Sequence, residues 1–153
     1  MTEESCIFCK IAKGEAPCHK IWENDEFIAF LSIFPNTEGF TVVTSKIHYP
    51  SYVFSLHEKI YAGLCAAAKE VGLLLDEKLG VARCAMIAEG LGIDHAHIKI
   101  IPLHGIKKNT KWQGMTAHID QYFEKYEGYV SSHDYVRADE RDLDRLARQI
   151  RKE

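Results

Sequence analysis

The sequence contains no apolar run long enough to cross a membrane and no large excess of charge of either sign. A membrane-spanning helix needs about 20 consecutive apolar residues, so we expect no membrane partner. Binding to nucleic acid is dominated by basic side chains, and a net charge of −3 gives no reason to expect it. Residues 1–5 are acidic and are not followed by a long apolar stretch, so they do not resemble a signal peptide.

A second C-x-x-C motif is also missing, and the five cysteines are an odd number. Without an export signal, this count favours free thiols in the reducing environment of the cytoplasm over a disulfide framework. The single C-x-x-C, Cys6 to Cys9, follows no predicted strand and so does not fit a thioredoxin-like redox pair. It would supply half of a Cys2His2 zinc site if His48 and His95 supplied the rest. The alternative is that both cysteines pack as small apolar residues.

The length of 153 residues and a hydrophobic content of 46% suit one domain, 1–153. Short apolar strands flank one long amphipathic helix, an order typical of an α+β fold with a mostly antiparallel sheet. Ser55 is predicted to cap the start of that helix, and Gly80 to end it. The predicted helices are 7–12, about 56–79, 116–126 and one beginning at Asp139; the predicted strands are 19–23, 27–33, 40–44, 81–88 and one following Gly92. The core spans about 6–103, and 104–153 is a C-terminal extension.

The most informative segment, residues 93–103, reads Ile-Asp-His-Ala-His-Ile-Lys-Ile-Ile-Pro-Leu. Alternate side chains of a strand share a face. One face is therefore predicted to carry Ala96, Ile98 and Ile100 into the core, and the other to carry His95, His97, Lys99 and Ile101. Burying two imidazoles and an ammonium in a row is costly without a ligand, and a metal or a phosphate would supply one.

His97 is the candidate nucleophile, because a neutral imidazole attacks phosphorus or an acyl carbon and the adduct stays reactive. The alternative is a core histidine whose ring is satisfied by a backbone carbonyl. Lys99 has three interpretations: it reaches solvent from a strand end, binds phosphate as a fixed positive charge, or lowers the pKa of His97 by like-charge repulsion. A lysine is a poor general acid unless its own pKa is strongly lowered.

Gly90 and Gly92 come just before the two histidines, where glycine lets the backbone approach an anion closely and offer N–H groups. A plain bend between two strands explains them equally well. Glu89 and Asp94 either orient a neighbouring side chain or are simply solvated. Ser32 is a further candidate for a polar contact.

The segment His95-Ala-His-Ile-Lys-Ile-Ile resembles the motif of the histidine triad (HIT) superfamily, in which three histidines at alternate positions are each followed by an apolar residue. Other segments resemble bacterial members in order and spacing: Cys6-Ile-Phe-Cys-Lys-Ile, Gly14-Glu15, Phe27-Ile-Ala-Phe-Leu, Pro35 with Gly39, Val42-Val43, Lys46-x-His48-Tyr49, Glu89-Gly90 and Ile101-Pro102. The resemblance covers about residues 6–103.

This resemblance implies a HIT-like α+β fold with a five-stranded antiparallel sheet, and a homodimer. It also implies binding of a nucleotide or nucleoside phosphate and cleavage at the α-phosphate, either by hydrolysis of phosphoramidates or dinucleoside polyphosphates or by nucleotidyl transfer. His97, at the middle position, would form a covalent nucleotidyl-histidine intermediate, and Cys6, Cys9, His48 and His95 would hold a structural Zn²⁺. Beside the resemblance, the chemistry of the residues themselves leaves Lys99 as the expected phosphate contact and Ser32, Gly90 and Gly92 as candidate substrate contacts.

The sequence departs from the family pattern at positions that contact the nucleotide. Lys99 stands at the third histidine, Ser32 at the ribose-binding aspartate, Phe40 at a histidine after the Pro-x-x-x-Gly turn, and Leu91 and Gly92 at polar positions before the triad. Each change removes a contact to ribose or phosphate. A second hypothesis is therefore a zinc-stabilised nucleotide- or phosphate-binding protein with weak or no catalysis. A third is an interaction scaffold that uses the C-terminal helices.

Overall fold

A computed structural model describes residues 2–106, 122, 124 and 125 of the chain. The chain divides into two compact units, residues 1–111 and 112–153, and every described helix and strand belongs to the first. The helices expected at 116–126 and after Asp139 lie outside the described residues, apart from three isolated positions. The single domain and its C-terminal extension therefore stay predictions.

Five strands form one antiparallel sheet in the order β1-β2-β3-β5-β4. The elements along the chain are η1 (Glu3–Ser5), α1 (Ile7–Ala12), β1 (His19–Glu23), β2 (Phe27–Leu31), β3 (Thr41–Ser45), η2 (Val53–Ser55), α2 (Glu58–Lys78), β4 (Cys84–Ile87) and β5 (His97–Pro102). This arrangement confirms the predicted α+β class and the predicted five-stranded sheet. Within the described residues, no helix has the length and apolar composition that a bilayer crossing needs.

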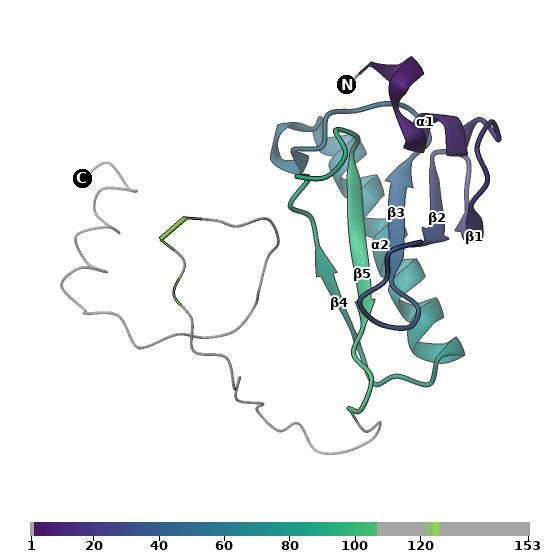
Figure 1. The fold of residues 1–153 in the computed structure, drawn as a ribbon, viewed down its shortest axis with the longest axis vertical. Coiled ribbons are helices and arrows are strands. Elements are labelled where there is room, and N and C mark those ends of the chain that lie inside the picture. Colours follow the sequence, from purple (N-terminus) through teal and green to yellow (C-terminus); the bar gives the residue numbers. More distant parts are fainter. Residues whose placement is uncertain (1, 107–121, 123, 126–153) are drawn as a thin grey trace. The chain divides into compact units, whose positions relative to one another are not determined.

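The long helix α2 covers one face of the sheet (Figure 1). Its buried side chains recur at helical spacing and pack against the inward face of the strands: Leu64, Ala67, Ala68, Val71 and Leu75 from the helix, and Phe27, Ala29, Val43, Ala96, Ile98 and Ile100 from the sheet. The predicted division of the histidine strand into an apolar face and a polar face is thereby confirmed, because Ala96, Ile98 and Ile100 all lie in this core.

The predicted N-cap of α2 is wrong by two residues. Ser55 lies in η2, where its hydroxyl donates to the carbonyl of Tyr52 at 2.8 Å. The chain is then extended at Leu56, and His57 becomes the N-cap, its Nδ1 accepting from the backbone N–H of Lys59 at 3.3 Å. Ser55 was a plausible cap by residue type, but a competing local turn already uses its side chain. At the other end, Gly80 follows the helix with φ +68°, as its predicted role requires.

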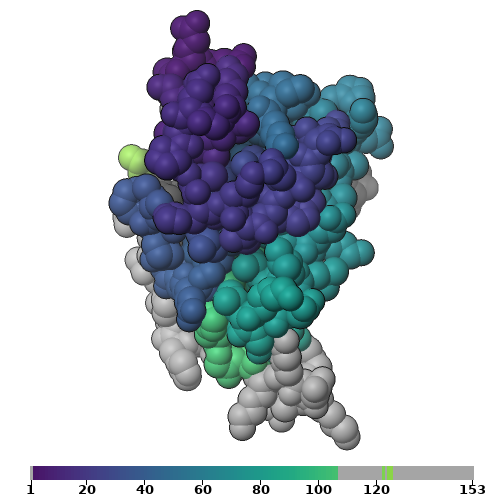
Figure 2. Space-filling model, turned by 90° about the vertical axis from the view of Figure 1, so that its right-hand side faces the viewer, coloured from purple at the N-terminus to yellow at the C-terminus, as the bar shows by residue number. Residues whose placement is uncertain are grey.

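The short helix α1 lies on the face opposite α2. Phe8 and the two cysteines of the C-x-x-C motif pack there with Ile28, Phe30 and Val42. Figure 2 shows the N-terminal segment in purple against the indigo hairpin of β1 and β2. This face holds both an apolar cluster and the polar residues of β5.

Several strands are shorter than predicted. β2 ends at Leu31 and β3 begins at Thr41, one residue after the expected Phe40. β4 spans Cys84–Ile87 rather than 81–88, since β5 supplies ladder partners only from Lys99 to Pro102. β5 begins at His97, so residues 88–96 form a connecting loop instead of the first half of the strand.

Candidate active site and metal centre

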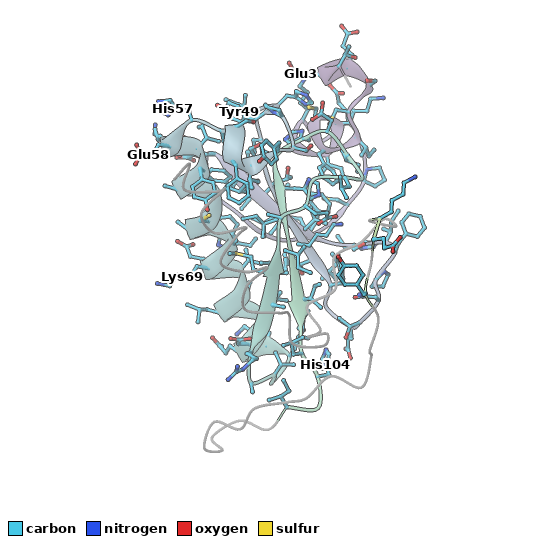
Figure 3. All side chains as sticks on the ribbon, turned by 90° about the vertical axis from the view of Figure 1, so that its left-hand side faces the viewer. Glu3, Tyr49, His57, Glu58, Lys69 and His104 are labelled. Carbon is cyan, nitrogen blue, oxygen red and sulfur yellow. The ribbon has the colours of Figure 1, made fainter. Side chains whose placement is uncertain are left out.

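Two loops meet at one end of the sheet and bring the histidines together. The backbone N–H of Ala96 donates to the carbonyl of Tyr49 at 2.8 Å, and the carboxylate of Asp94 accepts from the N–H of Ser51 at 3.0 Å. These bonds join the loop after β3 to the loop before β5, and so place His48 beside the start of β5. Figure 3 shows Tyr49 and Glu3 at this end of the sheet and His104 at the other.

Gly90 allows these loops to touch. It has φ +66°, and a Cβ atom at this position would lie 2.7 Å from the carbonyl oxygen of Ser51. The close backbone approach expected of this glycine is therefore observed, but it is made to another loop of the protein. A Cβ atom at Gly92 would meet no other part of the described chain within 4 Å, and this residue needs no special backbone conformation. Contacts of either glycine to a substrate stay predictions.

Four potential metal ligands converge where α1 meets the two loops. Cys6 Sγ lies 3.3 Å from His95 Nδ1, and Cys9 Sγ lies 3.4 Å from the same nitrogen and 3.3 Å from His48 Nδ1. All four ligand atoms lie within 4.8 Å of one another. In a tetrahedral zinc site with ordinary bond lengths, a sulfur and a nitrogen ligand are about 3.6 Å apart. The spacing of the donors therefore suits a metal ion of this kind.

The ring of His95 is held in the tautomer that a metal requires. Its Nε2 donates to the carbonyl of Ser45 at 2.8 Å, and the Ser45 hydroxyl lies 3.1 Å from the same nitrogen. Burial lowers the pKa of His95, so the neutral ring carries its proton on Nε2 and leaves the Nδ1 lone pair toward the thiols. A second hydrogen bond that orients a histidine ligand in this way is typical of metal sites. Sequence reasoning missed this role of Ser45.

The thiols also have the properties expected of metal ligands. Burial raises the pKa of Cys9 to about 11, and the adjacent Cys6 acts in the same direction. Two buried thiolates would be unstable without a compensating positive charge, and a dication supplies it while displacing the protons. All five cysteines of the chain are free thiols, so Cys6 and Cys9 are available as ligands. Donor type, donor spacing and the orientation of the His95 ring together fit a closed Cys2His2 site.

His97 lies on the same face of β5, next to the metal-ligand cluster. Its Nδ1 donates to the backbone carbonyl of His95 at 2.6 Å, which leaves the lone pair on Nε2. No described residue forms a hydrogen bond to Nε2. Burial lowers the pKa of His97, the ammonium of Lys99 lowers it further, and the carboxylate of Glu89 opposes them. His97 is 3% exposed, and its neutral ring keeps a lone pair on Nε2, as a nucleophile requires.

Phe8 was not predicted as a site residue, yet it contacts both histidines. Its ring meets His97 edge-on with centroids 5.4 Å apart, His95 at 5.9 Å and Phe30 at 5.5 Å. Phe8 comes from between the two cysteines of the C-x-x-C motif, so the metal-ligand segment also covers the candidate nucleophile. Its position inside that motif was the signal available in the sequence.

The ammonium of Lys99 forms an ion pair with the carboxylate oxygen Oε1 of Glu89. The side chain of Lys99 is 27% exposed and that of Glu89 is 8% exposed, so Lys99 does not simply extend into solvent. Glu89 orients a neighbouring side chain, which was one of the two alternatives for it. Asp94 does the same for the Ser51 loop.

Ser32 lies just beyond the end of β2. Its Oγ accepts from the backbone N–H of Phe34 at 3.2 Å, and its own N–H donates to the carbonyl of Phe40 at 2.8 Å. The described structure therefore gives Ser32 a role in the turn. A contact of this hydroxyl to a substrate stays a prediction.

A family model described as the HIT domain matches residues 13–106 of the chain. The match includes the whole sheet, α2, His48 and the residues of β5, and it begins just after α1 and its two cysteines.

Two relatives have names that describe an activity. An adenosine 5′-monophosphoramidase of Schizosaccharomyces pombe is 34% identical over 99 residues, covering 64% of this chain and 74% of that protein. An adenylylsulfatase of Arabidopsis thaliana is 30% identical over 105 residues, covering 65% of this chain and 53% of that protein, so the chain matches about half of its length.

One solved structure of similar fold is described as bound to zinc. A zinc-bound histidine triad family protein of Mycobacterium smegmatis has a TM-score of 0.62 and 25% identity, covering 72% of this chain and 86% of that chain. The Cys2His2 cluster of this chain can therefore be compared with a metal-bound structure of similar fold.

Proposed function

This chain belongs to the HIT family, and we propose that it is a nucleotidyl hydrolase or transferase that acts through a covalent intermediate on His97. The observation that carries the proposal is the orientation of this ring. The carbonyl of His95 accepts the Nδ1 proton, and the lone pair of Nε2 points away from that bond. The names of two relatives, a phosphoramidase and an adenylylsulfatase, support hydrolysis at the phosphate of an adenosine nucleotide.

In the proposed reaction, the Nε2 lone pair of His97 attacks the α-phosphorus of the nucleotide. The bond from phosphorus to the leaving group breaks, and the leaving group departs with the electron pair and takes up a proton from solvent. The ring then carries a positive charge, which the His95 carbonyl stabilises through Nδ1–H. Water or another acceptor then attacks the phosphorus and releases a proton to solvent, while the bond from phosphorus to Nε2 breaks and its electron pair restores the neutral ring. The ammonium of Lys99 is proposed to interact with a phosphate oxygen during both steps.

We further propose that Cys6, Cys9, His48 and His95 hold a structural zinc ion. When bound, the ion would cross-link α1 to the ends of β3 and β5 and would have no open position for a substrate. The substrate is proposed to contact Ser32, Gly90 and Gly92. A cytoplasmic location and a homodimer are further parts of the proposal, consistent with free thiols and with the outer position of β4 in the sheet.

The test compares the wild-type protein with His97→Ala and with a control variant, His104→Ala. His104 lies at the opposite end of the sheet and bonds to the carbonyl of Glu38 (Figure 3). The assay uses a fluorogenic adenosine phosphoramidate, and mass spectrometry detects a trapped adenylyl adduct. We expect turnover and an adduct on residue 97 in the wild type and in His104→Ala, and neither in His97→Ala. Equal rates in all three would exclude His97 as the nucleophile.

A second candidate function is nucleotide or phosphate binding without substantial catalysis. The low exposure of His97 and the engagement of Lys99 by Glu89 favour it, since both limit the access of a reacting phosphate. Calorimetry with nucleoside monophosphates distinguishes the two functions. Binding without turnover or adduct would support this candidate, and binding of neither nucleotide nor phosphate would exclude both.

A further inference from the structure

The ion pair beside His97 joins β5 to the loop that follows β4. Lys99 lies directly opposite Ile87, the last residue of β4, in the pairing of the two strands. Directly opposite residues share a face of an antiparallel sheet, and Glu89 follows Ile87 by two residues in the loop. The carboxylate thus reaches the face that carries Lys99 and His97, and its partner there is the ammonium.

The charge of Glu89 is balanced by Lys99 within the described structure. Oε1 is bonded to the ammonium, whereas Oε2 is buried and has no hydrogen-bond partner among the described residues. The pair has a net charge of zero. Without the charge of Glu89, Lys99 would give the face beside His97 a full positive charge. Such a charge attracts phosphate groups over several ångströms.

We propose that Glu89 is a positioning and specificity-determining residue that favours substrates whose leaving group carries no negative charge. The inference rests on the proposed function and names its substrate class. These substrates are nucleoside phosphoramidates of neutral amines, as opposed to nucleotides whose leaving group is a phosphate or a sulfate. Glu89 acts through Lys99, which it holds in place, and through its own charge.

Two physical effects support this selectivity. An anionic leaving group adds negative charge near Glu89, and the repulsion cancels most of the attraction that Lys99 provides. A leaving group with an N–H can in addition donate to a carboxylate such as that of Glu89, whereas phosphate and sulfate oxygens can only accept. A carboxylate beside the leaving group therefore disfavours the anionic substrate and favours the amine.

The experiment measures kcat/KM for two substrates with the same adenosine phosphate: a phosphoramidate of a neutral amine and a dinucleoside tetraphosphate. The quantity compared is the ratio of the two values in the wild type, Glu89→Gln, Lys99→Gln and the double variant. Glu77→Gln is the control, because Glu77 forms an exposed ion pair with Lys78 on α2. Thermal unfolding checks that each variant is folded.

We expect Glu89→Gln to shift the ratio toward the tetraphosphate on the order of tenfold, the size of effect that one charge has at several ångströms in a partly buried site. Lys99→Gln should shift it in the opposite direction, the neutral double variant should return close to the wild-type ratio, and Glu77→Gln should leave it unchanged. If Glu89→Gln lowers both values equally, Glu89 has only a structural role and the inference is overturned. If the wild type turns over neither substrate, the proposed function fails and this inference fails with it.

Discussion

Replacing Cys9 by serine should remove most of the stability that the proposed zinc ion would give the chain. The helix that carries Cys9 has 6 residues, and an isolated helix of this length is not stable in water. α1 therefore depends on the burial of Phe8 and on the four donors at the cluster. A serine hydroxyl keeps the approximate shape of the side chain but is a poor zinc ligand, so the change acts mainly on metal binding.

The size of the stabilisation by zinc depends on how far apart the ligands lie in the sequence. Cys6 and His95 are 89 positions apart in the sequence, so the complete donor set exists only in the folded chain. A ligand that binds only the folded state stabilises it by about 4 kcal/mol when its free concentration exceeds the dissociation constant roughly 1,000-fold. For a chain of 153 residues, each kcal/mol shifts the melting temperature by about 2–4 °C. We therefore expect zinc to raise the wild-type melting temperature by roughly 8–16 °C under these conditions.

The assay is thermal unfolding in buffered free zinc and in chelator, with Cys18→Ser as the matched control. Cys18 is a half-buried thiol that packs against the same apolar cluster as Cys9 but lies outside the four donors. The wild type and Cys18→Ser should show the full zinc-dependent shift, and Cys9→Ser should show little of it. A wild-type melting temperature that is the same in zinc and in chelator would refute the metal site. A full shift in Cys9→Ser would refute the assigned ligand.

Three further variants test other parts of the site. Phe8→Ala should cost about 3–4 kcal/mol of unfolding free energy at saturating zinc, because this ring is 7% exposed; a loss below about 1 kcal/mol in denaturant unfolding would contradict its packing role. Burial would raise the pKa of Glu89, but the ammonium of Lys99 outweighs burial and holds that pKa below its ordinary value. The ion pair therefore stabilises the fold above the ordinary carboxyl pKa, and this stabilisation is lost as pH falls. The stability difference between the wild type and Glu89→Gln should thus be smaller at pH 3.5 than at pH 7, and an equal difference would count against the ion pair. Gly90→Ala should lower the free energy of unfolding by about 2 kcal/mol or more, and Gly14→Ala by about 1 kcal/mol. Both glycines have positive φ, but only at Gly90 does a backbone carbonyl lie 2.7 Å from the new Cβ, so equal unfolding midpoints for the two variants would exclude the close approach.

The faces of β5 were predictable because alternation in a strand depends only on local backbone geometry. Ala96 and Ile98 reach the core beneath α2, and His97 and Lys99 lie on the other face, as their spacing requires. The convergence of the two cysteines with His48 and His95 was predictable by residue chemistry, although the sequence alone left apolar packing open as an alternative.

Other features depended on contacts between segments that are distant in sequence. Gly90 is explained by the approach of Ser51, and no local pattern indicates which loop that will be. Ser45 orients His95 through its backbone carbonyl, a group that every residue possesses and that residue type cannot identify. The start of α2 is predicted two residues too early because the Ser55 hydroxyl can bond either to the first turn of a helix or to the turn before it. In the structure it donates to the carbonyl of Tyr52. Sequence patterns thus identify which side chains face each other more readily than which backbone groups hold them.

One residue of the metal-ligand cluster, His95, also bonds to the proposed nucleophile, His97, and would connect the metal site to the proposed catalysis. The ring of His95 is fixed at both nitrogens, by the thiols and by the Ser45 carbonyl, while its own carbonyl accepts the Nδ1 proton of His97. The direction of that carbonyl sets the tautomer of His97, and hence which nitrogen would attack phosphorus in the proposed reaction. A zinc ion that never touches the substrate would therefore still affect the rate, because it would help to fix the residue whose carbonyl orients His97.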